Sequence, residues 1–350
     1  MDPLPSPRPR PAGLLLPVEL ILRIIECLVD SPTALLRRSD PRTRALLSFT
    51  TVCTATYPLS SLMLRRHCAS VESSRQLARL LTSRYFADPP PKLPDPRMPW
   101  RAITSLHLAP FGTTLDDQPT AVWVRELFCH VCDTLTRLVV DMPFASLDRF
   151  DDHLDVRATL RDGFAKLIHL EEFVCLSEYP QLSTADSTTD VWRLWPELRR
   201  LMLFHVPLAD HWLWWNIATL PHLKFVWFIE PKPGISAPLR VNLKKIYFSS
   251  LPRDDPLLKK KLTVAVADSW YVKDIYLTHE WPQLDPDGCM TFRLFGQGLQ
   301  DEKREKRRSW LQRNIERGTL WDLEEAERSL GDGVEEGLNG PVAELAELSI

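Results

Sequence analysis

The chain has little glycine and no long apolar run. It contains 12 glycines against 30 prolines in 350 residues, so stiff breaks should separate many short elements. Its segment 14–29 is interrupted by Pro17, Glu19 and Arg23, which excludes a membrane-spanning helix there. The first 13 residues are proline-rich and lack the apolar stretch of a secretory signal. The formal net charge of −3 gives no reason to expect a nucleic acid or a membrane as partner.

Signatures of catalysis and of metal binding are also missing. The sequence has no H-E-x-x-H, no G-x-G-x-x-G and no phosphate loop, so we expect no enzyme activity and no cofactor. Its seven cysteines follow no framework spacing, which favours reduced thiols in an intracellular protein, in the cytoplasm, the nucleus or both. Cys129 and Cys132 form one C-x-x-C without a second ligand pair. We expect them to be core cysteines of a helix, although a metal or redox role stays open.

Composition divides the chain into six parts. We predict a disordered lead at 1–13, a helical unit at 14–66, a helix and proline-rich linker at 67–99, a repeat domain at 100–298, charged helices at 299–330 and a flexible tail at 331–350. In the helical unit, Pro17 suits the first position of a helix that ends before Pro32. Its apolar positions follow a spacing of three and four residues, which predicts an amphipathic helix over 17–29. A second apolar run covers 45–66.

A short motif, apolar-x-x-apolar-x-apolar, recurs in the repeat domain, where x is any residue. Its copies are Ile103-Leu106-Leu108, Leu135-Leu138-Val140, Leu170-Phe173-Cys175, Leu198-Leu201-Leu203, Leu223-Val226-Phe228, Leu243-Ile246-Phe248 and, weakly, Val272-Ile275-Leu277. The later part of each copy reads as a strand with alternate residues inward. Helix-like stretches lie between copies, as at 155–170 and 209–220. Strand and helix alternating at this pitch predict a parallel sheet.

The helical unit resembles an F-box, whose pattern is roughly L-P-x-E-L-x-x-x-I-x-x-x-L. The matching residues are Leu16, Pro17, Glu19, Leu20, Ile24 and Leu28, and the pair Val52-Cys53 resembles a later part of the domain. The whole chain is similar to fungal F-box proteins with irregular leucine-rich-like repeats. The resemblance implies an α/β fold: a three-helix F-box followed by an irregular leucine-rich-repeat-like solenoid with a curved parallel sheet.

The same resemblance implies a function. An F-box docks on a Skp-type adaptor and through it on a cullin, so the chain would be the substrate-recognition subunit of an SCF-type ubiquitin ligase. The adaptor would contact Leu16, Pro17, Leu20, Ile21, Ile24, Leu28, Leu47, Val52 and Cys53. Two alternatives stay open. The helix at 17–29 could be only an N-terminal cap on the repeat domain, or the chain could be an interaction scaffold that binds a Skp-type adaptor, or nothing, without directing ubiquitination. An enzyme with a cryptic site is a third possibility.

Three features depart from the family patterns. The usual tryptophan-containing segment after Val-Cys is missing, and a basic loop from Val29 to Ala45 leaves the second helix poorly defined. The repeats lack the asparagine that normally closes each turn. Tryptophans gather in the middle repeats, where they either fill the core or bind the protein substrate. For the second role we single out Trp212, Trp214, Trp215 and Trp227.

Overall fold

The computed structural model contains ten α-helices and one eight-stranded sheet within its described residues. These residues are 16–29, 31–85, 102–147, 152–180, 182–184, 189–232, 242–267, 281–295, 301–322 and 324. The prediction of an α/β chain with a parallel sheet is therefore confirmed. The expected lead, the proline-rich part of the linker and the whole tail at 331–350 lie outside the described residues.

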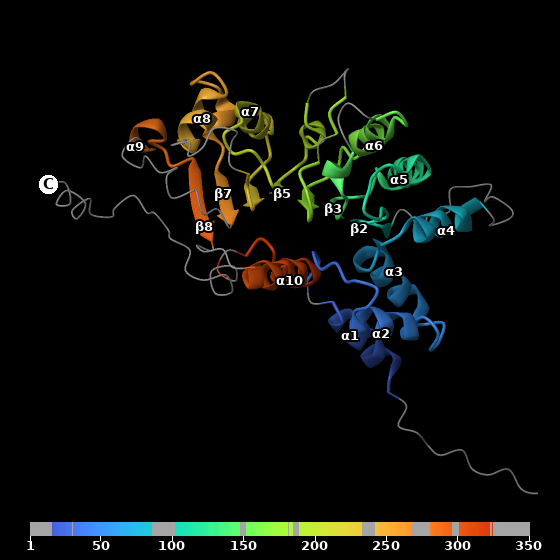
Figure 1. Cartoon of the computed structure of the whole chain (residues 1–350). Helices are drawn as coiled ribbons and strands as arrows, with labels where there is room; N and C mark the ends of the chain where they lie inside the picture. The colour runs from blue at the N-terminus through green and yellow to red at the C-terminus, as the bar shows by residue number, and fades with distance from the viewer. Residues whose placement is uncertain are drawn as a thin grey trace, which may run out of the picture.

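Three helices form the N-terminal unit, at the blue end of Figure 1: α1 (Val18–Cys27), α2 (Pro41–Phe49) and α3 (Tyr57–His67). The α2 helix begins at Pro41, and the side chain of Asp40 caps it by accepting a hydrogen bond from the Arg42 N–H at 2.8 Å. The expected second run at 45–66 is thus two helices, separated by a turn at residues 50–56. The poorly defined basic loop contains the start of the first of them.

All eight strands are parallel and lie side by side in the order of the sequence. They are β1 (Ser70–Val71), β2 (Ser105–Leu108), β3 (Arg137–Val140), β4 (Glu172–Cys175), β5 (Arg200–Phe204), β6 (Phe225–Ile229), β7 (Leu262–Ala267) and β8 (Met290–Phe295). Residues at the same register share a face, so one row across the sheet runs Val139, Val174, Met202, Trp227, Ala265. Because neighbouring strands are parallel and consecutive in the sequence, each is joined to the next by a crossover connection. Crossovers of one hand place all these connections on the same face of the sheet.

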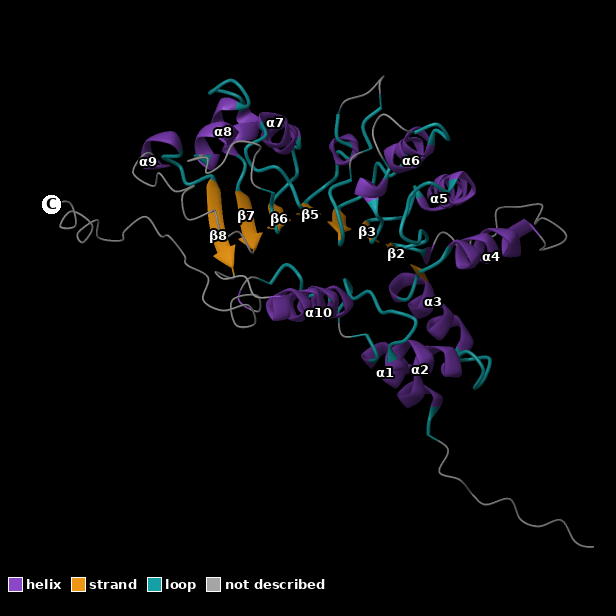
Figure 2. Ribbon diagram, viewed as in Figure 1, coloured by secondary structure: helices purple, strands orange, loops and turns teal. Residues whose placement is uncertain are grey.

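Helices cover one face of this sheet (Figure 2). They are α4 (Ser74–Tyr85), α5 (Gln118–Val131), α6 (Val156–Ala165), α7 (His211–Thr219), α8 (Leu243–Ser249) and α9 (Trp281–Leu284). Asp117, Asp210 and Asn242 cap the starts of α5, α7 and α8. The main core lies between these helices and the sheet, and it contains the inward residues of five predicted repeats, such as Leu138, Phe173 and Leu201. The helices predicted at 155–170 and 209–220 are confirmed.

Within the described residues, one helix covers the opposite face: α10 (Asp301–Arg317), which lies below the strands in Figure 2. Trp310, Leu311 and Ile315 of this helix, together with Leu320 after it, are buried in a second core with Val139, Val174, Met202, Trp227 and Ala265. The sequence predicted one or two surface helices in this region. The charged helix is present, but its few apolar residues make it a cover for the sheet.

One of the seven predicted repeat strands is contradicted by the structure, and another cannot be compared with it. The copy Leu243-Ile246-Phe248 was wrong, because Asn242 caps a helix there and Leu243–Ser249 is α8. The weak copy Val272-Ile275-Leu277 lies outside the described residues. The strands that continue the sheet are instead β7 and β8, and a short β1 was missed at the other edge.

Candidate docking surface

The α1 helix exposes most of its apolar side chains. Only Ile25 of this helix is buried, whereas Leu16, Leu20 and Ile24 are 56%, 51% and 44% exposed. Leu20 and Ile24 are four residues apart and so lie on one side of the helix. Leu16, just before the helix begins, lines the same open depression as these two side chains, and we name the three residues the α1 stripe. The depression has a volume of about 410 Å³, and its lining is Leu16, Leu20, Arg23, Ile24, Cys27 and Leu28.

The α1 helix is therefore apolar on two sides. Ile25 packs inward with the half-buried Ile21, and the stripe faces outward. A surface helix of a self-sufficient domain normally keeps polar residues on its outer face. Burying one such side chain is worth roughly 1.5–3 kcal/mol, so an uncovered line of three is costly without a partner. Contiguous exposed apolar residues of this kind mark interaction sites.

The other predicted adaptor contacts lie at the end of α2 and in the turn that follows it. Leu47 is 49% and Val52 57% exposed, and Pro17 and Cys53 are exposed as well. Thr56 shapes this turn: its buried hydroxyl donates to the Phe49 carbonyl at 2.7 Å. Its hydrogen bonds to Cys53 also lower the pKa of that thiol. Of the nine predicted contacts, only Ile21 and Leu28 are half-buried, so the set is accessible to a partner.

A junction joins the three-helix unit to the sheet, and the segment 33–37 is at its centre. On one side, the Leu36 N–H donates to the His67 carbonyl at the end of α3 (2.6 Å). On the other side, the Thr33 hydroxyl donates to the Gly318 carbonyl after α10 (3.1 Å), and Arg37 pairs with Glu316 (3.4 Å). The segment is thus held between α3 and α10.

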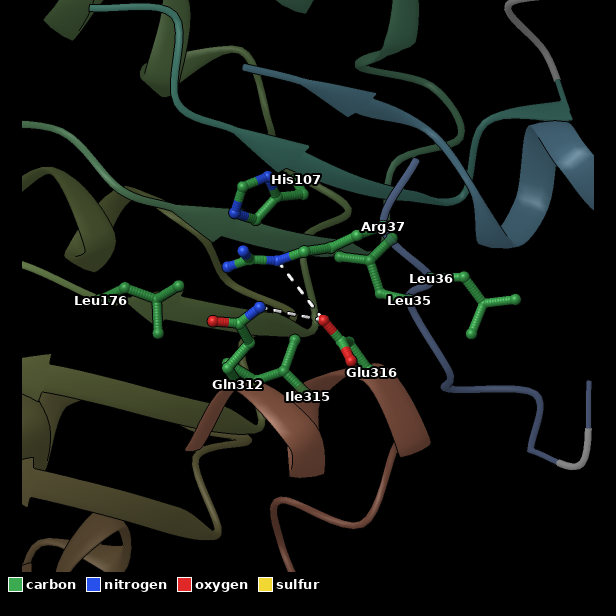
Figure 3. Close-up of a pocket in the computed structure, with 8 residues that line it drawn as sticks. All are labelled: Leu35, Leu36, Arg37, His107, Leu176, Gln312, Ile315 and Glu316. Carbon is green, nitrogen blue, oxygen red and sulfur yellow. Dashed lines mark hydrogen bonds and ion pairs between the residues drawn. The ribbon is translucent and has the colours of Figure 1, made fainter. Parts of the chain in front are cut away.

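A narrow pocket lies in this junction, shown in Figure 3. Its space of about 10 Å³ is at the lower limit of what one water molecule needs. It is bounded by Leu35, Leu36, Arg37, His107, Leu176, Gln312, Ile315 and Glu316. Burial lowers the pKa of His107, and the neighbouring Arg37 lowers it further. Burial likewise lowers the pKa of His67, whose ring Nδ1 lies 3.0 Å from the Ala34 carbonyl oxygen. Both imidazoles therefore favour their neutral form.

A buried ion network ties α10 to the sheet. Glu172 on β4 lies between Arg137 (2.5 Å) and Arg200 (2.9 Å), and the Arg137 Nη2 donates to the Ile315 carbonyl of α10 (3.4 Å). Glu172 is 1% exposed, so the two guanidinium groups compensate a carboxylate that would be costly to bury alone. Sequence reasoning missed this network, because its members are far apart in the chain and meet only through the register of the strands.

The four tryptophans proposed for substrate binding do not share one environment. Trp214 lies in the main core, where its indole N–H donates to the Leu208 carbonyl at 2.7 Å. Trp227 lies under α10, with its ring centre 6.2 Å from that of Trp310. Both are fully buried, so the core interpretation applies to them. Trp212 is 66% exposed and Trp215 is half-buried, on the outer side of α7.

The expectation of core cysteines is wrong for one of the two C-x-x-C residues. Cys129 is exposed on the outer side of α5, whereas Cys132, just after the helix, is half-buried and packs against the main core. No group of three or more His, Cys, Asp or Glu side chains suited to a metal occurs in the described part of the chain. None of the helices described is both long enough and apolar enough to cross a bilayer.

No family model matches this chain, and no curated protein matches it at a significant level.

Proposed function

We propose that this chain is the substrate-recognition subunit of an SCF-type cullin-RING ubiquitin ligase. In this proposal the helices α1 to α3 are an F-box that docks on a Skp-type adaptor, and the strands and helices beyond them are an irregular leucine-rich-repeat-like solenoid that holds the substrate protein. The chain itself makes or breaks no bond. The observation that carries the proposal is the α1 stripe, which coincides with the L-P-x-E-L motif.

The size of the stripe is consistent with docking on another protein. Leu16, Leu20 and Ile24 are already about half-buried, so a partner that covered them would add about 2–5 kcal/mol of gross burial. Association itself costs several kcal/mol, so the stripe alone would give weak binding. The exposed Leu47 and Val52 would supply further contact area. An adaptor that covers both the stripe and the turn after α2 satisfies this requirement.

The order of the elements also supports the proposal. The junction fixes the three-helix unit to the sheet through hydrogen bonds at both sides of the segment 33–37. A substrate receptor needs such a connection, because the adaptor and the substrate must be held at a set separation during ubiquitin transfer. The scaffold alternative would make the same contacts with the adaptor, but it would direct no ubiquitination.

Co-purification of the full chain with a Skp-type adaptor tests the proposal. Replacing Leu16 and Pro17 by Ala should abolish it, because both residues are exposed at the start of the stripe. The matched control replaces Ile168 and Leu194 by Ala, two exposed apolar residues in the sheet part of the chain, and should bind as the wild type does. Adaptor binding that survives the Leu16/Pro17 change would rule out the F-box assignment.

Neighbouring isoleucines separate docking from folding. Ile24→Ala should weaken adaptor binding and leave the free energy of unfolding unchanged, since Ile24 is 44% exposed. Ile25→Ala should lower that free energy by about 2–5 kcal/mol, because Ile25 is fully buried. Both are measured by denaturant unfolding and by adaptor pull-down. Accumulation of a specific protein when the chain is deleted would then distinguish a ligase receptor from a scaffold.

A further inference from the structure

A second group of exposed apolar side chains lies on the helical side of the sheet. Outside residues 16–57, the large apolar residues that the structure shows as exposed are Ile168, Leu194 and Trp212. Leu194 ends the short helix Val191–Leu194, which packs against α7, the helix that carries Trp212. We name Arg193, Leu194, Trp212 and Trp215 the α7 patch. It lies on the opposite side of the sheet from α10 (Figure 2).

The centre of the α7 patch is a stack of one cation and two rings. The guanidinium carbon of Arg193 lies 3.8 Å from the centre of the Trp215 ring. The Trp212 ring meets Trp215 edge to face at 5.5 Å, and it remains 66% exposed. Contact with the indole face fixes the Arg193 plane but leaves its in-plane N–H groups available. The patch thus presents donors and an apolar ring side by side.

None of the ion pairs found in the described residues includes Arg193. The two acids next to the patch in the sequence, Asp190 and Asp210, have other partners. Asp190 accepts a hydrogen bond from the Asn216 amide at 2.7 Å, and Asp210 caps α7 by accepting from the Trp212 N–H at 2.9 Å. The complementary group for the half-buried Arg193 guanidinium is a carboxylate on a binding partner, which can accept two parallel hydrogen bonds from it. A single arginine balances one carboxylate, whereas a doubly charged phosphate calls for more than one cation.

We propose that the α7 patch is a second docking surface, which binds a peptide segment that presents a carboxylate next to an apolar side chain. The carboxylate binds the Arg193 fork, and the apolar side chain packs on Trp212 and Leu194. Tryptophan and arginine are the residue types that dominate the energetics of protein interfaces. The inference that this segment belongs to the ubiquitination substrate rests on the proposed function; the surface itself does not.

A selection of random dodecapeptides displayed on phage against the immobilised full chain tests the proposal. Enriched peptides should carry Asp or Glu beside an aliphatic or aromatic residue. A synthetic peptide from this pool should bind Arg193→Ala and Trp212→Ala at least about tenfold more weakly, as expected for hot-spot residues. Arg193→Lys, which keeps the charge but loses the fork, should bind with intermediate affinity. The controls Arg253→Ala and Ile168→Ala, at exposed positions outside the patch, should bind as the wild type does.

Three results would overturn the proposal: no acidic residue in the enriched pool, equal binding to the patch variants and the controls, or tighter binding when phosphoserine replaces the acidic residue. The last result would assign the surface to a phosphorylated partner. Adaptor co-purification of the same variants keeps the two proposals separable. Patch variants should retain the adaptor, and the Leu16/Pro17 variant should retain the peptide, so either surface can fail alone.

Discussion

The three-helix unit and the sheet treat their apolar residues in opposite ways. In the unit, α1 buries Ile25 alone and leaves the stripe exposed. In the sheet, even residues on the second face, such as Val174 and Trp227, are fully buried, because α10 covers them. The sheet therefore completes its own core from within the chain, whereas the unit leaves a surface that needs a separate partner.

This difference bears on where partners bind. A bare sheet face would be the obvious place for a substrate on a parallel array, but here the second face is occupied by Trp310, Leu311 and Ile315. Exposed apolar side chains in the described residues instead gather on the three-helix unit, which carries the α1 stripe, and in the α7 patch on the helical side. Substitutions on the sheet should therefore lower stability, whereas substitutions at the exposed positions should affect binding and leave stability nearly unchanged.

The largest effect is expected where α10 covers the sheet. Trp227→Ala should lower the free energy of unfolding by about 3–5 kcal/mol, because it removes a large side chain packed between Phe295 and Trp310. Trp212→Ala, at an exposed position on α7, should cost less than about 0.5 kcal/mol. Urea unfolding followed by circular dichroism measures both. Equal costs for the two changes would mean that α10 does not cover Trp227 in solution.

A smaller effect is expected at the junction. Gly318 has a φ of +75°, and a Cβ there would lie 2.4 Å from the Thr33 hydroxyl oxygen. Gly318→Ala should therefore lower the free energy of unfolding by about 1–3 kcal/mol and loosen the segment 33–37. Hydrogen exchange of the Leu35 amide, which donates to the Ile315 carbonyl at 3.4 Å, reports on this segment directly.

The matched control is Gly112→Ala, since a Cβ at Gly112 would meet no atom within 4 Å. It should change neither the stability nor the exchange of Leu35. Unchanged exchange in Gly318→Ala would contradict the view that the residues after α10 hold the three-helix unit against the sheet.

The sheet could be predicted from the sequence where strand and turn signals agree. Five copies of the repeat motif, from Ile103 to Phe228, end in the strands β2 to β6. The next copy failed, because an apolar residue three positions before another fits a short helix as well as a strand. Asn242 caps a helix there, which buries Leu243 and Tyr247 instead of following the strand alternation. In β7 the apolar alternation lacks the leading residue, since Lys261 stands where the motif needs one.

The sequence contains a signal that both faces of the sheet are covered. Strands such as FVWFI at 225–229 and RLVV at 137–140 are apolar at almost every position, and strands of this kind are buried on both faces. Which segment covers that face could not be predicted, because Trp310 is more than 80 residues from Trp227 in a highly charged helix. Of the proposed site residues, the motif placed the exposed α1 stripe, but composition did not separate Trp212 from Trp227.

The smallest effect is a dependence of the junction on pH. Burial lowers the pKa of His67 and of His107 below their ordinary value of 6.5, and Arg37 lowers that of His107 further. The unfolded chain then binds protons more readily than the folded chain just below pH 6.5. The free energy of unfolding should consequently decrease as the pH falls from about 7.5 towards the folded-state pKa values, and level off below them.

The double variant His67→Asn/His107→Asn should flatten this dependence of stability on pH. The control His222→Asn, at an exposed position, should leave the dependence unchanged. Denaturant midpoints measured across this pH range decide the matter: a slope that persists in the double variant would place the pH-sensitive groups outside the junction.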